Sequence, residues 1–194
     1  EWLDGITLRD LINQSPDEIT PALVALVARD LLTAILVMEA MGYKHDDMNL
    51  GNLMLEQPNA RLAAINPAKA VRRLRIIDLG SMKPFDKATA KPDDDWSLSA
   101  KCLAELHNTL HANRSLASQY PQFLKSLRDF ICDLADDPSR KFPDQGDYIR
   151  RIEQAEQLIT IEPRPEAAFH PLEAISAEHL ADDAILLELF VKHL

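Results

Sequence analysis

Two short polar loops hold the residues of this sequence that could do chemistry. The first, KHDDMNLGN over Lys44–Asn52, contains adjacent carboxylates and two amides. The second begins at Asp78, directly after the apolar run LRII of Leu74–Ile77. Carboxylate and amide oxygens are ligands that magnesium prefers, and a carboxylate can also orient an attacking hydroxyl group. Phosphoryl transfer needs this combination, so it is the reaction class that the two loops favour.

The elements around the two loops are suited to bring them together. Apolar residues at helical spacing predict a long helix that begins at Thr20 and Pro21 and ends near Gly42, just before the first loop. The run LML after the first loop and the run LRII before the second indicate two short strands. A small antiparallel ribbon would hold the loops at its strand ends near one another.

Helices are expected to make up most of the remaining chain. The stretch DDDWSLSAKCLAEL predicts a helix capped by its aspartates, and two more helices are expected near Pro121–Ala135 and Asp147–Ile159. Residues 161–181 contain three prolines and are interpreted as a linker, followed by an apolar terminal helix at residues 182–194. Residues 1–160 are therefore expected to form one α+β domain that is mainly α-helical.

Composition and charge narrow the class of protein. A chain of 194 residues, 46% of them hydrophobic, can bury a sizeable core, and its net charge of −10 disfavours non-specific binding of nucleic acid. The most apolar stretch, Ala22–Tyr43, contains Arg29 and Asp30, which would be costly at a bilayer centre, so a core helix is expected there. Cys102 and Cys132 are too few for a disulfide framework, which favours a reducing, cytoplasmic setting.

The polar loops resemble motifs of a known family. His45–Asn52 matches the catalytic loop H-x-D-x-x-x-x-N of protein kinases, and Asp78–Gly80 is similar to their D-F-G magnesium motif. Asp94–Leu98 resembles the D-x-W-S-L opening of the central helix, and Asp137–Lys141 resembles the D-P-x-x-R stretch before the last helix. In this order the motifs resemble the C-terminal lobe of the protein-kinase-like superfamily, of an atypical bacterial serine/threonine-kinase-like type.

The resemblance implies a role for five residues. Asp47 would orient the substrate hydroxyl or accept its proton. Asn52 would offer its amide oxygen to a magnesium ion, and Asp78 would bridge the metal to the phosphates of ATP. Asp94 would accept hydrogen bonds from the catalytic-loop backbone, and His45 would hold the loop by hydrogen bonds. Taken alone, each of Asp47, Asn52 and Asp78 would be better explained as a cap on a backbone turn.

The beginning of the chain would form part of a nucleotide site. EWLDGITLRDLI predicts a strand end, a turn at Asp4 and Gly5, and a short helix. By the resemblance, the backbone from Glu1 to Leu3 is the hinge that hydrogen-bonds adenine, and Met54 forms an apolar floor beneath the base. Ordinary core packing suits Met54 equally well. ATP and magnesium are the implied cofactors.

The sequence departs from the kinase pattern in three respects. No glycine-rich loop, strand lysine or helix glutamate precedes the hinge, so the chain alone is expected to bind ATP weakly and to be inactive without an N-terminal lobe. Only thirteen residues separate Gly80 from Asp94, and none of them forms an A-P-E ending. Asp46 replaces the arginine that commonly reads a phosphorylated activation segment, which disfavours regulation by such a phosphate. Asn49 stands where serine/threonine kinases tend to carry a lysine that touches the γ-phosphate, and it could hydrogen-bond a phosphate oxygen without charge.

The favoured function is that of a Mg-ATP-dependent phosphotransferase, acting on serine or threonine hydroxyls of a protein when an N-terminal lobe is attached. The short segment after Gly80 keeps open a small-molecule kinase of the aminoglycoside- or choline-kinase type. A catalytically silent scaffold is the third hypothesis, in which the helix at Leu186–Leu194 holds a partner protein or a second copy. Nucleic acid and membranes are not expected partners.

Overall fold

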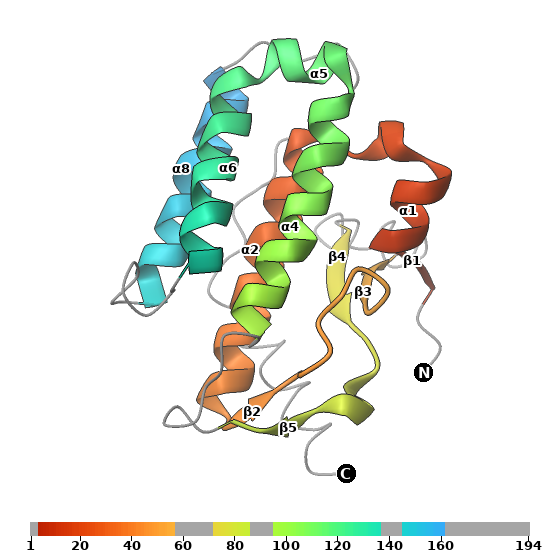
Figure 1. Ribbon diagram of the computed structural model, residues 1–194, viewed down its shortest axis with the longest axis vertical. Coiled ribbons are helices and arrows are strands. Elements are labelled where there is room, and N and C mark those ends of the chain that lie inside the picture. Colours follow the sequence, from red (N-terminus) through yellow and green to blue (C-terminus); the bar gives the residue numbers. More distant parts are fainter. Residues whose placement is uncertain (1–3, 57–71, 86–94, 137–144, 162–194) are drawn as a thin grey trace, which may run out of the picture. The chain divides into compact units, whose positions relative to one another are not determined.

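The computed structural model describes residues 4–56, 72–85, 95–136 and 145–161. All of them lie in the first of the two units into which the chain divides, Glu1–Pro163 and Arg164–Leu194. Within these residues the chain forms helices and two small antiparallel sheets, an α+β arrangement that is mainly α-helical (Figure 1). Several sequence predictions lie outside the described residues: those for Glu1 and Leu3, Asp94, Asp137–Lys141, the linker and the terminal helix.

The long apolar helix is confirmed as α2, Pro21–Ala40. The Thr20 hydroxyl caps it by accepting a hydrogen bond from the backbone N–H of Leu23 at 3.2 Å, and Gly42 follows its end with a φ of +80°. The helix is long and apolar enough to cross a membrane, but 61% of its most apolar window is buried, as expected for a core helix. The apolar residues that predicted it are at most 5% exposed: Leu23, Val27, Leu31, Ile35 and Met38.

Three further long helices pack around α2 or around one another. Helices α4 and α8 contact α2, and α6 contacts both α4 and α8. Trp96, expected in the core, is 6% exposed and stacks on Tyr148 of α8 with ring centroids 4.5 Å apart. The sequence predicted α6 and α8 to within about two residues at each end and the start of α4 equally closely, whereas α4 continues six residues beyond the stretch that predicted it. The bounds are α4 Asp95–Ala112, α6 Pro121–Asp136 and α8 Gln145–Ile161, with the unpredicted α5 at Arg114–Gln119.

Two small sheets lie beside the helices. Strands β1 (Gly5–Thr7), β3 (Leu53–Glu56) and β4 (Arg73–Ile76) form one sheet in the order β1-β3-β4, and β2 (Tyr43–Lys44) pairs with β5 (Lys83–Pro84). All of these pairs are antiparallel. The predicted strands at LML and LRII are thus confirmed, although β4 begins and ends one residue earlier than predicted. Helix α1 (Leu8–Gln14) follows β1, and a short 3-10 turn (Pro16–Glu18) follows α1.

The predicted turn at Asp4 and Gly5 is wrong for Gly5, which lies in strand β1 opposite Glu56. The glycine is needed there because β1 crosses β3 closely. A Cβ atom at Gly5 would lie 2.5 Å from the carbonyl oxygen of Leu55 and 2.8 Å from Cγ of Met54. The glycine therefore serves a close approach of two strands, which a single sequence does not distinguish from a turn.

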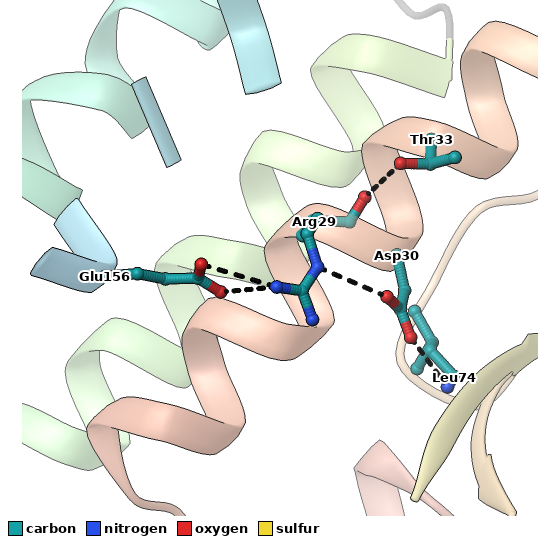
Figure 2. Close-up of polar contacts among 5 residues, drawn as sticks. All are labelled: Arg29, Asp30, Thr33, Leu74 and Glu156. Carbon is teal, nitrogen blue, oxygen red and sulfur yellow. Dashed lines mark hydrogen bonds and ion pairs between the residues drawn. The ribbon is translucent and has the colours of Figure 1, made fainter. Parts of the chain in front are cut away.

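A network of charged residues crosses the middle of α2, and we call it the α2 charge network (Figure 2). Nη1 of Arg29 donates to both carboxylate oxygens of Glu156 on α8, at 3.0 and 3.3 Å. Next to it, Asp30 lies 3.9 Å from Nε of Arg29 and accepts the backbone N–H of Leu74 in β4 at 3.2 Å. The network thus ties a distant helix and the strand before Asp78 to the same turn of α2.

Candidate active site

The first polar loop is anchored by its apolar residues. Met48 and Leu50 are 2% and 0% exposed, and the carbonyl of Leu50 accepts the backbone N–H of Arg9 at 3.1 Å. Asp47 lies beside Met48 but is exposed. Because the apolar side chains of the loop turn into the core, the Asp47 carboxylate is presented to solvent.

His45 and Asp95 fix the start of this loop. The imidazole of His45 is fully buried, and its Nε2 lies 3.0 Å from the carbonyl oxygen of Ile77, which can only accept, so Nε2 carries the proton. Asp95 accepts the backbone N–H groups of His45 and Asp46 at 2.6 and 3.0 Å. His45 thus holds the loop as the resemblance implied, and its bond to Ile77 joins the two polar loops.

The role expected of Asp94 is filled by Asp95. Asp95 is 3% exposed and begins helix α4, whereas Asp94 lies outside the described residues. The run of three aspartates before Trp96 offers several carboxylates at similar distances from the helix start, so spacing alone could not select one. The distinguishing signal is burial, because a buried carboxylate needs donors and the loop backbone supplies them.

Asp46 stands where the kinase motif commonly has an arginine, and its carboxylate binds two lysines. Its carboxylate forms ion pairs with Lys44 and Lys83, which lie opposite each other on β2 and β5. These hydrogen bonds to the lysines lower the pKa of the Asp46 carboxyl from 3.8 to about 2. Two like charges facing each other across strands would repel, so the carboxylate between them stabilises the small sheet.

Asp47 is contacted by two side-chain amides. Nδ2 of Asn52 donates to the main-chain carbonyl of Asp47 at 2.9 Å and to its Oδ2 at 3.0 Å. Nδ2 of Asn49 donates to the same carbonyl at 3.1 Å and to Oδ1 at 3.2 Å. The predicted pair Asp47 and Asn52 is therefore in direct contact, and Asn49 joins it, which the sequence did not predict.

The register of β3 and β4 brings Asp78 to the same place. Leu53 pairs with Ile76, and the N–H of Ile77 donates to the carbonyl of Asn52 at 2.9 Å. Asp78 follows as an exposed residue with a φ of +59°. Left-handed backbone is uncommon outside glycine but is tolerated by aspartate, and it concentrates in functional loops. Asp47, Asn52 and Asp78 thus lie on adjoining segments.

Asn52 and Asp78 offer an oxygen set that suits magnesium better than zinc. Both hydrogen bonds of the Asn52 side chain use its nitrogen, which leaves Oδ1 on the opposite side of the amide. Across the described ranges no group of three or more His, Cys, Asp or Glu residues could hold a metal ion. Magnesium needs only one or two protein oxygens because it keeps waters and takes phosphate oxygens, so these two residues fit it.

Met54 lies on the sheet next to the beginning of the chain. It is half-buried in β3 and faces Thr7 in the register of β1, with its Cγ and Sδ close to Gly5. The side chain therefore packs partly on β1 and keeps some exposed surface. The adenine contact predicted for Met54 stays a prediction, as do the hinge contacts of Glu1 and Leu3.

Comparisons with known proteins identify the fold. No protein-family model matches the sequence, and no curated protein matches it. The structure is similar to one described as the crystal structure of Rad53 kinase domain and SCD2, with a TM-score of 0.53 and 17% sequence identity. The match covers 96% of this chain and 72% of that chain. At this identity the likeness establishes the fold alone, and the chain has a protein-kinase-like fold.

Proposed function

We propose that this chain is the C-terminal lobe of a phosphotransferase that uses magnesium and ATP to phosphorylate serine or threonine hydroxyls of a protein. The observation that carries the proposal is the contact of Asn52 with Asp47 beside the strand pair that leads to Asp78. The protein-kinase-like fold supports a kinase-like enzyme. The serine or threonine acceptor rests on the sequence motifs.

In the proposed mechanism Asp47 accepts a hydrogen bond from the acceptor hydroxyl and takes up its proton as the hydroxyl oxygen bonds to the γ-phosphorus of ATP and the bond from that phosphorus to the departing ADP breaks. Asn52 through Oδ1 and Asp78 through its carboxylate would hold a magnesium ion, which would offset the charge of the phosphates. His45 and Asp95 keep the loop in place without touching the substrate. The protein's contribution is thus mainly positioning, as phosphoryl transfer requires.

The direct test is transfer of radiolabelled phosphate from ATP to protein. It compares the complete gene product, the present chain alone, and both samples carrying Asp47→Ala. Transfer by the complete product should fall roughly a hundredfold or more in Asp47→Ala, because a positioned proton acceptor contributes about that much. Asp129→Ala, which removes an exposed carboxylate on α6, is the matched control and should not change transfer. Equal transfer by wild type and Asp47→Ala would rule out the mechanism.

A small-molecule kinase is the second candidate, and the segment of thirteen residues between Gly80 and Asp94 favours it. A protein acceptor needs a docking surface, and that segment is short for one. The same assay with small alcohols as acceptors separates the two, because label would then appear in the small molecule and not in protein. Absence of transfer to either acceptor would favour the scaffold hypothesis.

A further inference from the structure

We propose that Asn49 is a positioning residue whose side-chain amide holds the Asp47 carboxylate in the orientation that an acceptor hydroxyl requires. The inference rests on the proposed function, in which Asp47 binds the acceptor hydroxyl. The hydrogen bonds from which it is drawn do not depend on that function. The contact between Asn49 and Asp47 and the proposed function can therefore be disproved separately.

The two amides bind different oxygens of one carboxylate. Asn49 donates to Oδ1 of Asp47 at 3.2 Å and Asn52 donates to Oδ2 at 3.0 Å. Rotation of an aspartate carboxylate about its last bond is otherwise broad, with little preference between orientations. Donors on both oxygens restrain that rotation, whereas Asn52 alone would restrain only one side.

A turn explains one half of the Asn49 contacts but not the other. Its Oδ1 accepts the N–H of Gly51 at 2.9 Å and its carbonyl accepts the N–H of Asn52 at 2.9 Å, which is ordinary for asparagine at the first position of a turn. A turn does not require the bonds from Nδ2 to Asp47. The amide orientation is fixed chemically, since reversing it would set oxygen against the Asp47 oxygens and N–H against N–H.

Gly51 leaves room for the Asn49 amide. A Cβ atom at Gly51 would lie 3.0 Å from Oδ1 of Asn49, so a side chain there would crowd the amide in its present position. Asn49 is neutral, and its hydrogen bonds are weaker than those of a charged donor. It therefore restrains Asp47 without neutralising the carboxylate, which remains exposed and keeps lone pairs for an incoming hydroxyl.

The two halves of the Asn49 contacts can be separated by substitution. Asn49→Asp keeps an oxygen for the N–H of Gly51 but removes the donor to Asp47 and sets a negative charge beside it. Asn49→Ala removes both contacts. Asn113→Asp is the matched control: Oδ1 of Asn113 accepts the N–H of Leu116 at 3.3 Å at the start of α5, so the same change keeps a cap elsewhere in the domain.

Nuclear magnetic resonance of the side-chain amides tests the contact without any activity. The NH₂ signals of Asn49 and Asn52 in the wild-type chain should both differ from those in Asp47→Asn, because the carboxylate that accepts from both amides is then absent. The signal of Asn113 should be the same in both proteins. An Asn49 signal unchanged by Asp47→Asn would overturn the proposal, whatever the chain catalyses.

Kinetics of the complete gene product test the consequence. Asn49→Asp should lower kcat roughly tenfold to a hundredfold, because a misplaced reacting group costs about this much, with the KM for ATP unchanged within about twofold. Asn49→Ala should cost less, and Asn113→Asp should cost nothing. Wild-type kcat in Asn49→Asp would overturn the positioning role. If the wild type transfers phosphate to no acceptor, the proposed function fails, and the amide signals alone then decide the contact.

Discussion

Two polar networks in this domain are built in opposite ways. The α2 charge network joins Arg29 to Glu156, residues 127 positions apart, through mostly buried charged groups. The loop network, formed by Asp47, Asn49 and Asn52, joins residues at most five positions apart. It sets neutral amides on an exposed carboxylate. The first connects distant elements, and the second orients one side chain.

The two networks should therefore serve different purposes: the α2 charge network stabilises the fold, and the loop network serves the proposed chemistry. A charge left behind in a buried network has lost its water and its partner together, so removing one member is costly. Water can replace a lost partner in an exposed loop. Substituting a residue of the loop network should therefore change stability little and affect mainly function. Each prediction below compares the two networks, starting with the largest expected loss of stability.

Arg29→Met should destabilise the domain by about 2 to 3 kcal/mol, because it removes the cation that binds both carboxylate oxygens of Glu156. The free energy of unfolding in urea measures this loss. Arg9→Met is the matched control, since the Arg9 pair with Glu105 is half-exposed at 3.6 Å and should contribute less than about 1 kcal/mol. Equal losses in the two variants would contradict the contrast between buried and exposed networks.

Asp95→Ala should cost about 2 kcal/mol, because the backbone N–H groups of His45 and Asp46 would lose a buried acceptor. The same urea measurement gives the loss. This variant extends the comparison because Asp95 is more deeply buried than the α2 charge network, yet it supports the loop network. Amide hydrogen exchange at His45 and Asp46 should accelerate more than exchange in α6; uniform acceleration would mean that Asp95 serves the whole fold.

Glu156 of the α2 charge network and Asp46, the neighbour of the loop network, should make stability depend on pH with opposite signs. Burial raises the pKa of Glu156 above its ordinary value of 4.5, so its contribution to stability is greatest below that value and is lost as pH rises through the raised pKa. Asp46, lowered from 3.8 to about 2, contributes stability above 3.8 that is lost as pH falls toward 2. The free energy of unfolding is measured across pH for wild type, Glu156→Gln and Asp46→Asn. The difference between wild type and Glu156→Gln should fall as pH rises, and the difference between wild type and Asp46→Asn should rise.

Asp47→Asn should change the free energy of unfolding by less than about 0.5 kcal/mol, because the side chain is exposed and surface substitutions rarely cost more. Its phosphate transfer in the complete gene product should nonetheless be lost. Thermal unfolding beside the radiolabel assay measures both. A large loss of stability would place Asp47 with the architectural residues and weaken its assignment to chemistry.

The sequence predicted those helices and strands whose ends or apolar runs are marked by nearby residues. Thr20 and Pro21 marked the start of α2, Gly42 marked its end, and the apolar runs marked β3 and β4. Strands β2 and β5 were missed because two-residue strands have no period to detect and depend on a partner far along the chain. Helix α5 was missed for a similar reason, being only six residues long.

In the candidate site, too, some residues were predicted from the sequence and others were not. The resemblance of the first loop to the kinase catalytic loop implied that Asp47 and Asn52 act together, and the two residues are hydrogen-bonded, while their roles stay predictions. Asn49 gave no signal for a contact with Asp47, because an asparagine two residues before a glycine is typical of a turn and the direction of its Nδ2 depends on the folded loop. Asp95 was not selected because burial after folding, not residue type, distinguishes it from its neighbours.

The hydrogen bond from Leu74 to Asp30 has a consequence for association between molecules. In the described part of its sheet, β4 is an edge strand, and such an edge can recruit a strand from another chain. The carboxylate of Asp30, in the same domain, accepts the outward-facing backbone N–H of Leu74 in this strand. A foreign strand would have to displace that carboxylate, so the residue that ties β4 to α2 also protects the strand leading to Asp78 from aggregation.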